Sequence, residues 1–275
     1  MAPAMQILLT NDDGIYAPGL VAMQRALERL GDVCVVAPDR EQSGVGHSIT
    51  FLSPLMAKEV FDVRGDQPER RIGWAVEGSP ADCVKLALAR FPGGEPLCPE
   101  VPDLVVSGVN GGLNVGINVL YSGTVAAATE GALNDLPSIA VSLEYDEHAR
   151  FDRAAELAVE VIEQMLRHDA FSQHKLFNLN IPTAATRGPT GLKISEMGVI
   201  RWPAEFEERR DPKDRRYFWA RGLPPTEMPG ATTDLTGIAS GNATLTPLTI
   251  DRTRNEFLDT MRSWNLSLDS RRTER

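Results

Sequence analysis

The sequence predicts an α/β protein built around a parallel sheet. Residues 7–9 and 33–37 are short apolar runs without alternation, which is typical of strands that helices cover on both faces. Between them, Pro18 suits the start of a helix, and apolar residues recur at helical spacing as far as Leu30. A strand, a helix and a second strand in this order begin a right-handed parallel unit. We therefore expect a three-layer, Rossmann-like fold.

Further elements extend this pattern. Buried strands are expected at residues 103–107, 138–142 and 176–181. One long amphipathic helix is expected at about residues 152–166. Extended segments with turns are expected between residues 49 and 77, among them 61–63 and 72–76.

Another helix is expected to begin at Ser79, with Pro80 as its first residue and apolar residues as far as Phe91. Asp82 lies in the first turn of this helix, where the helix dipole favours an acidic residue. We therefore interpret Asp82 as a structural residue rather than a catalytic one.

The character of the chain changes after the last core strand. We assign residues 1–183 to a catalytic α/β core and residues 184–266 to an arm of β-hairpins followed by a helix at about 256–264. The arginine-rich tail, 267–275, is expected to be disordered. Long exposed hairpins are often exchanged between subunits, so we expect a homodimer or homotetramer that assembles through this arm.

Composition excludes several classes of protein. The chain has 275 residues, 42% hydrophobic and 24% charged, with a net charge of -10 and a pI near 5.0, which argues against binding to nucleic-acid polymers. Neither a signal peptide nor a membrane span is expected, and the predicted location is the cytoplasm. Cys34, Cys83 and Cys98 are far apart in the sequence, and we expect buried free thiols rather than a disulfide or a zinc site.

The first strand ends in two consecutive carboxylates, Asp12 and Asp13, between Asn11 and Gly14. Ligands of open α/β sheets bind outside the carboxyl ends of the strands, and Gly14 permits the turn that brings both carboxylates to one ion. A cation would offset the repulsion between the two charges. The alternative is a solvated turn without a ligand.

The loop after the second strand, residues 38–48, is expected to lie beside the first. It offers the hydroxyl of Ser43, close backbone approach at Gly44, and His47. The role of His47, structural or in contact with substrate, stays open.

The third loop, residues 108–118, is rich in glycine and asparagine, which tolerate tight turns and present backbone groups to a ligand. An alanine-rich helix follows, and Ser122, Gly123 and Thr124 form its amino end. A helix amino terminus with hydroxyls and a glycine can hold phosphate without a lysine. Simple capping by Ser122 or Thr124 is the alternative.

Four motifs in these loops occur in the order in which they occur in the SurE family of stationary-phase survival proteins. They are Thr-Asn-Asp-Asp-Gly at 10–14, Ala-Pro-Asp-Arg-x-x-Ser-Gly at 37–44, Ser-Gly-Val-Asn-x-Gly-x-Asn-x-Gly at 107–116 and Tyr-Ser-Gly-Thr-Val-Ala-Ala-Ala-x-Glu-Gly at 121–131. The chain from Gln6 to about Thr253 resembles this family. Gly112 and Asn118 depart from it, because the family often has a larger residue and an acid there.

The resemblance implies a phosphatase that hydrolyses nucleoside monophosphates with one Mg²⁺ or Mn²⁺ per subunit. The implied metal ligands are Asp12, Asp13, Ser43 and Asn110, and the two aspartates are also the implied catalytic residues. Their oxygen atoms suit a hard cation. The implied residues of the substrate and phosphate site are Asn11, Gly44, Asn114, Ser122, Gly123 and Thr124. The preferred base, 5′ against 3′ specificity and activity on polyphosphate stay open.

Two alternatives are considered. A phosphatase of the haloacid dehalogenase kind would use one aspartate as a nucleophile, but it requires an acid two positions later, where Gly14 and Ile15 stand. A nucleotide-sensing module without turnover is the second alternative, since doubly wound sheets bind nucleotides in many proteins that are not enzymes.

Overall fold

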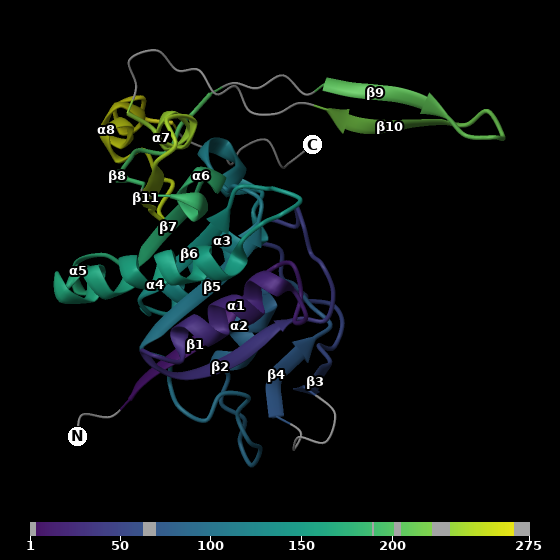
Figure 1. Ribbon diagram of the computed structural model, residues 1–275. Helices are drawn as coiled ribbons and strands as arrows, with labels where there is room; N and C mark the ends of the chain where they lie inside the picture. The colour runs from purple at the N-terminus through teal and green to yellow at the C-terminus, as the bar shows by residue number, and fades with distance from the viewer. Residues whose placement is uncertain (1–3, 63–69, 189, 201–204, 222–231, 267–275) are drawn as a thin grey trace, which may run out of the picture.

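The computed structural model describes residues 4–62, 70–188, 190–200, 205–221 and 232–266. Its centre is a nine-stranded sheet in the order β3-β4-β2-β1-β5-β6-β7-β11-β8 (Figure 1). The parallel part of the sheet consists of β4 (Arg70–Val76), β2 (Gly31–Pro38), β1 (Met5–Thr10), β5 (Leu104–Gly111), β6 (Ser138–Leu143) and β7 (Leu176–Ile181). The buried strands expected from the sequence all lie in this part, so the predicted parallel sheet is confirmed.

The two edges of the sheet contain antiparallel pairs. β3 (Ala57–Asp62) pairs antiparallel with β4, and β11 (Ala243–Pro247) pairs antiparallel with β7. β8 (Leu192–Ile194) then pairs parallel with β11. The main sheet therefore crosses the predicted domain boundary at residue 183, because two of its strands come from the later part of the chain.

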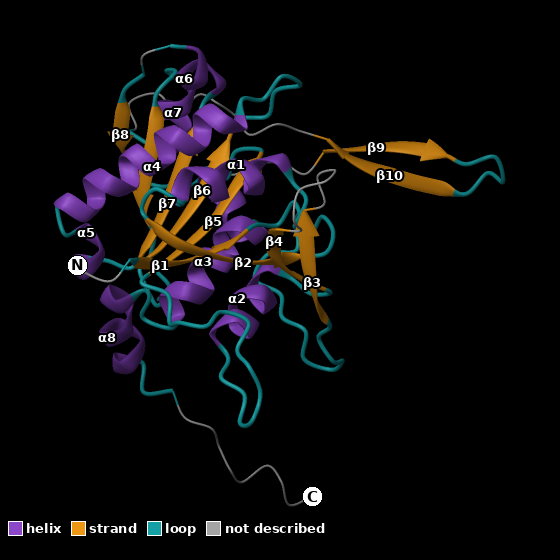
Figure 2. Cartoon of the chain, turned by 60° about the horizontal axis from the view of Figure 1, so that its bottom comes forward, coloured by secondary structure: helices purple, strands orange, loops and turns teal. Residues whose placement is uncertain are grey.

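Helices cover both faces of the sheet, which gives the expected three layers (Figure 2). The helices α1 (Pro18–Leu27) and α4 (Phe151–Arg167) pack on one face, and α2 (Pro80–Leu88) and α3 (Gly123–Leu133) pack on the other. The other helical elements are η1 (Gly116–Leu120), α5 (Ala170–Gln173), α6 (Thr183–Arg187), α7 (Asp234–Ala239) and α8 (Asn255–Ser263).

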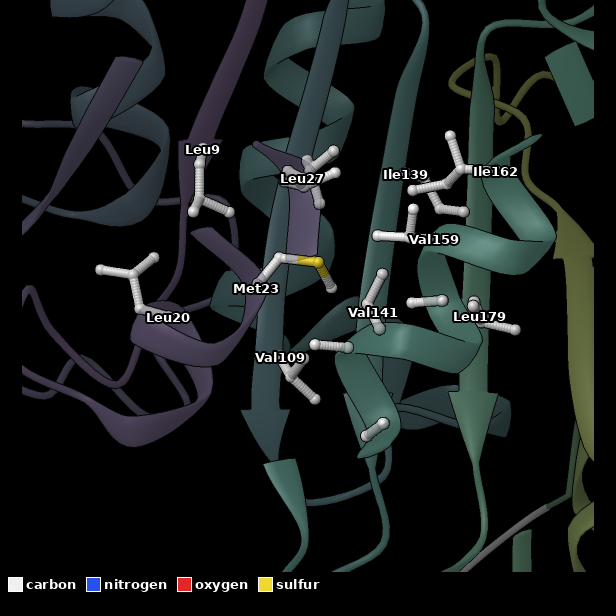
Figure 3. Close-up of a cluster of buried hydrophobic side chains, with 14 of the residues drawn as sticks. Leu9, Leu20, Met23, Leu27, Val109, Ile139, Val141, Val159, Ile162 and Leu179 are labelled. Carbon is white, nitrogen blue, oxygen red and sulfur yellow. The ribbon is translucent and has the colours of Figure 1, made fainter. Parts of the chain in front are cut away.

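Side chains of β1 alternate between the two cores. Leu9 points into the cluster with α1 and α4, which also contains Met23, Val141 and Ile162 (Figure 3). Leu8 joins the cluster with α2 and α3. Each fully buried leucine stabilises the fold by about 1.5–3 kcal/mol relative to an exposed one. Because both faces of β1 are buried, packing fixes the position of its carboxyl end. The acidic residues that follow are held in place by the same packing.

Local capping fixes the start of α2. The Ser79 hydroxyl accepts a hydrogen bond from the Asp82 amide, and the Asp82 carboxylate accepts one from the Ser79 amide. Asp82 also accepts hydrogen bonds from the amide and the hydroxyl of Thr50. The predicted structural role of Asp82 is therefore confirmed. The helix ends at Leu88, earlier than predicted, because Ala89 is extended; Phe91 is 40% exposed.

The strand β5 is longer than the sequence predicts. A loop is predicted from Gly108, but Asn110 and Gly111 pair with β6 after a break in register. The peptide bond between Gly108 and Val109 is cis, and Gly108 has φ +135°. A side chain at Gly108 would overlap the carbonyl oxygen of Val141, so the close approach of β5 and β6 requires glycine here.

The cysteine prediction is wrong for two of the three residues. Cys34 on β2 and Cys98 in the loop before β5 form a disulfide, and the buried Cys83 is the free thiol of the described residues. The Cα atoms of the pair are 5.8 Å apart, within the range that a disulfide spans. A separation of 64 residues in the sequence conceals this proximity.

A second, two-stranded antiparallel sheet consists of β9 (Glu205–Arg210) and β10 (Arg216–Arg221). This ribbon extends away from the main sheet (Figure 1). Its aromatic residues are solvent-exposed: Phe206 by 62%, Phe218 by 52% and Trp219 by 59%. α8, at the position predicted for the last helix, buries none of its residues. The predicted disordered tail, 267–275, lies outside the described residues.

No helix in the described segments combines the length and apolar character needed to cross a membrane.

We expect Gly19→Ala to destabilise the fold. A Cβ atom at Gly19 in α1 would overlap the carbonyl oxygen of Val109 in β5. Overpacking of this kind costs about 1–3 kcal/mol. Urea denaturation measures the loss of unfolding free energy. Gly188→Ala is the matched control, because a Cβ there meets nothing within 4 Å; equal stability of the two variants would contradict the packing argument.

Candidate active site

The turn after β1 is built by Asn11 and Gly14. The Asn11 side chain, which is fully buried, donates to the Gly14 carbonyl at 2.9 Å and accepts from the Gly14 amide at 3.2 Å. Gly14 has φ +100°, a conformation that favours glycine. The amide of Asn11 thus shapes the turn that carries the two aspartates. Its predicted contact with substrate stays a prediction.

Asp12 lies against the amino end of α3. The Thr124 hydroxyl donates to Oδ1 of Asp12 at 2.6 Å, and the Asp12 residue is only 5% exposed. A Cβ atom at Gly123 would lie 2.9 Å from the Cβ of Asp12, so the helix approaches this closely only because residue 123 is glycine. Ser122 caps the helix by accepting from the Val125 amide at 3.1 Å. Ser122 therefore caps the helix and Thr124 is directed to the acidic pair. The predicted phosphate contact of this segment stays a prediction.

The two aspartates have perturbed acidities. Burial raises the pKa of Asp12 from 3.8 to about 6; the Thr124 hydroxyl opposes this rise and the charge of Asp13 adds to it. The pKa of Asp13 is also raised by burial, with the Gly111 amide lowering it and the charge of Glu41 raising it further. Two adjacent carboxylates that are both difficult to ionise are the electrostatic condition that a bound cation would relieve.

The loop after β2 meets the first loop, as the sequence predicts. The Gln42 amide donates to the Asp12 carbonyl at 2.7 Å. Beside it, the Ser43 hydroxyl donates to the Glu41 carboxylate at 2.6 Å. Gly44 has φ +72°, which allows the loop to turn after Ser43. Sequence analysis missed the contact of Glu41 with Ser43. The position of this acid, two residues before the predicted ligand Ser43, could have indicated it.

The end of β5 completes the site. The Gly111 amide donates to Oδ2 of Asp13 at 3.1 Å, which places the neighbouring Asn110 beside the aspartates. The Asn110 side-chain nitrogen donates to the Gly112 carbonyl at 2.7 Å. Its side-chain oxygen has no hydrogen-bond partner among the described residues. Asn110 therefore presents an unpartnered oxygen at this edge of the sheet.

Asn114 is held by protein groups on every side. Its side-chain nitrogen donates to the Ser142 hydroxyl at 2.8 Å and to the Thr124 hydroxyl at 3.3 Å. Both amide hydrogens are thereby used, and the remaining carbonyl oxygen is an acceptor, which does not bind the acceptor oxygens of a phosphate. The predicted substrate contact of Asn114 is untested, and its geometry favours a role in positioning Thr124.

The donor set fits a hard divalent cation. Oδ1 of Asp13 and the side-chain oxygen of Asn110 have no hydrogen-bond partner within the described part of the chain, and the side-chain hydrogen bond to Asp12 uses Oδ1 rather than Oδ2. No group of three or more His, Cys, Asp or Glu side chains in that part could hold a metal. A cation here would therefore combine the aspartates with neutral oxygens and water, the chemistry of Mg²⁺ or Mn²⁺ rather than of zinc.

His47 binds a buried carboxylate next to the site. Its Nε2 lies 2.9 Å from Oε2 of Glu130 on α3, and Lys85 on α2 donates to Oε1 of Glu130 at 3.1 Å. The His47 bond lowers the pKa of Glu130 against the opposing effect of burial, and Lys85 lowers it further. The His47 ring thus links the second loop to α3. A lone acid in an alanine-rich helix was the signal for Glu130, which sequence analysis missed.

We expect Glu130→Gln to lower the unfolding free energy by about 1–2 kcal/mol at pH 7, because a buried charged hydrogen-bond network is broken. A lowered folded-state pKa stabilises the fold above the ordinary value of 4.5, and this contribution is lost as pH falls through the lower folded value. The difference between parent and variant should shrink in acid. Urea denaturation from pH 7 to pH 4 measures it, with the exposed Glu160→Gln as control; a constant difference would refute the argument.

Comparison with known proteins gives a consistent result. A family model described as survival protein SurE matches residues 7–204. The 5′-nucleotidase SurE of Rhodopirellula baltica is 51% identical over 262 residues, which is 95% of this chain and 99% of that protein. The 5′-nucleotidase SurE of Desulforudis audaxviator is 41% identical over 263 residues, covering 94% and 97% of the two chains.

A solved structure also matches. The crystal structure of the SurE protein from Aquifex aeolicus superposes with a TM-score of 0.78 at 33% identity, over 95% of this chain and all of that one. The family match, the full-length relatives and the shared fold agree with the motifs that the acidic turn, the second loop and α3 carry. The chain belongs to the SurE family.

Proposed function

We propose that this protein is a divalent-metal-dependent 5′-nucleotidase that hydrolyses nucleoside monophosphates to nucleoside and phosphate. The observation that carries the proposal is the contact between Thr124, at the amino end of α3, and Asp12 of the acidic pair. Relatives named 5′-nucleotidase SurE that match almost the whole chain support it.

We assign the metal to Asp12, Asp13, Asn110 and Ser43, with Mg²⁺ or Mn²⁺ as the ion and one ion per subunit. When bound, such a cation offsets the negative charge of the phosphate and lowers the pKa of a nearby water molecule. The Ser43 hydroxyl gives its hydrogen to Glu41, and its oxygen lone pairs stay available to the cation.

The residues of the chain have separate tasks in this proposal. The Gly123 amide makes no hydrogen bond within the described residues, and it points from the positive end of α3, so it is available to a phosphate oxygen. Gly44 permits close approach of the second loop. Asp13 is more exposed than Asp12, and we assign to its free oxygen the task of orienting the attacking water and accepting its proton.

The alternatives have less support. The haloacid dehalogenase mechanism lacks its second acid, and the family to which the chain belongs does not favour it. A nucleotide sensor would need no unpartnered carboxylate oxygens beside the helix terminus. Both alternatives predict different products: a phospho-aspartate in the first case and intact nucleotide in the second.

Assembly and location are part of the proposal. The ribbon of β9 and β10 has aromatic residues exposed on both strands, and an isolated two-stranded hairpin is marginally stable in water. Packing of this arm against another subunit would cover them, so we infer a homodimer or homotetramer. We place the enzyme in the cytoplasm, without membrane or nucleic-acid partners.

Phosphate release tests the function. We expect metal-dependent release from nucleoside monophosphates, faster than from p-nitrophenyl phosphate, with Mn²⁺ or Mg²⁺ and none with EDTA. Asp12→Asn should reduce kcat by about a thousandfold or more, because it removes an anionic ligand and neutralises half of the acidic pair. Substantial turnover of this variant with added Mn²⁺, or no turnover by the folded parent, would refute the assignment.

Metal removal gives a separate prediction for stability. Because the folded-state pKa of Asp12 is raised to about 6, its ionised form opposes folding at pH 7, and this cost vanishes as pH falls through 6 toward 3.8. In EDTA, Asp12→Asn should therefore be more stable than the parent by about 2–3 kcal/mol at pH 7 and by less at pH 4. Thermal unfolding measures this difference. Mn²⁺ should stabilise the parent and leave the variant unchanged; a variant less stable than the parent in EDTA would contradict the argument.

A further inference from the structure

A chain of buried polar side chains runs from β7 toward Asp12. Asn180, fully buried on β7, accepts from the Asn114 amide at 2.8 Å and donates to the Asn114 carbonyl at 3.2 Å. Asn178, also fully buried on β7, donates to the same carbonyl at 2.8 Å. The backbone of Asn114 is thus held by a strand that is separated from β5 by β6.

The side chain of Asn114 continues the chain to the active site. It donates to the Thr124 hydroxyl at 3.3 Å, and Thr124 donates to Oδ1 of Asp12 at 2.6 Å. An amide nitrogen can only donate and an ionised carboxylate can only accept. The Thr124 hydroxyl therefore has one orientation: it accepts from Asn114 and gives its single hydrogen to Asp12.

We propose that Asn180 is a positioning residue for the reaction, which acts through Asn114 and Thr124 to hold Oδ1 of Asp12 and leave Oδ2 directed at the cation. This inference rests on the proposed function. The side chain of Asn180 makes no hydrogen bond to the acidic pair, and its only side-chain hydrogen bonds in the described part of the chain are to Asn114. Partners that orient metal ligands from outside typically change metal affinity or activity by about 10–100-fold.

A purely structural role would not require these side chains. Polar groups in the interior of a strand lose free energy of hydration, which an apolar residue avoids. The Asn178 oxygen is buried and has no hydrogen-bond partner among the residues that the structure describes, so β7 retains polar residues even where their hydrogen-bonding capacity is incompletely used. What these asparagines share is their contact with the backbone of Asn114.

Mn²⁺ binding by titration calorimetry, which is independent of turnover, tests the proposal. For Asn180→Ala we expect the dissociation constant to rise by about tenfold and kcat for a nucleoside monophosphate to fall by a similar factor. Thr244→Val is the matched control. Thr244 lies opposite Asn180 in the register of β11 and β7, and its buried hydroxyl has no partner; its Mn²⁺ affinity should stay within about twofold of the parent.

A double-mutant cycle separates positioning from general loosening of the core. If Asn180 acts through Thr124, adding Asn180→Ala to Thr124→Val should change the dissociation constant by less than about twofold. Thr124→Ser keeps the hydroxyl and should restore the effect of Asn180→Ala. Should Asn180→Ala fail to fold, Ser142→Ala removes an acceptor of the Asn114 side-chain nitrogen, the group that donates to Thr124, and is expected to weaken Mn²⁺ binding severalfold.

Two results would overturn the inference. The first is a parent-like Mn²⁺ affinity of folded Asn180→Ala or, if that variant does not fold, of Ser142→Ala. The second is a double variant, Asn180→Ala with Thr124→Val, in which the effects of the two substitutions on the dissociation constant multiply. Failure of the proposed function gives a different result: the parent protein would bind Mn²⁺ but release no phosphate. A parent that binds no Mn²⁺ would overturn both.

Discussion

The close contact between Asp12 and the amino end of α3 is the constraint on which the site depends. It requires glycine at position 123, since a Cβ there would meet the Cβ of Asp12 at 2.9 Å. It also requires β1 to end at a fixed point, which the burial of Leu8 and Leu9 on opposite faces ensures. Because the contact buries Asp12, it raises the pKa of this carboxyl group. A bound cation would favour the ionised form again.

The parallel topology explains how residues so far apart in the sequence meet. The loops after β1 and β2 are joined by the Gln42 to Asp12 hydrogen bond, and β5 reaches Asp13 through the Gly111 amide. These strands are neighbours in the sheet and run in the same direction, so their carboxyl ends share one edge. The amino end of α3, where the helix dipole is positive, lies at the same edge. The sheet thus gathers acids, neutral oxygens and helix amides, and no lysine or arginine among the described residues is hydrogen-bonded to either aspartate.

Much of this arrangement follows from local sequence pattern. Apolar runs without alternation identify the central strands, and Asn11 to Gly14 identify the acidic turn, because their signals are contiguous. Pairings between distant segments leave no such signal: the Cys34 to Cys98 bond, the continuation of β5 through Asn110, and the contact of His47 with Glu130 depend on tertiary register. The predicted metal-ligand roles of Asp12, Asp13, Ser43 and Asn110 are compatible with the geometry and stay predictions.

The side chains that hold Asp12 from behind are neutral, and the charge of the acidic pair explains why. Two aspartates already repel each other, and Glu41 adds a third negative charge near Asp13. A further acid behind Asp12 would make its ionisation harder still, and a buried cation there would compete with the metal for the carboxylate. Asparagine, serine and threonine avoid both problems, since they fix the direction of each hydrogen bond without adding net charge. Neutral residues at Asn114, Thr124 and Ser142 therefore orient Asp12 while its charge remains available to the cation.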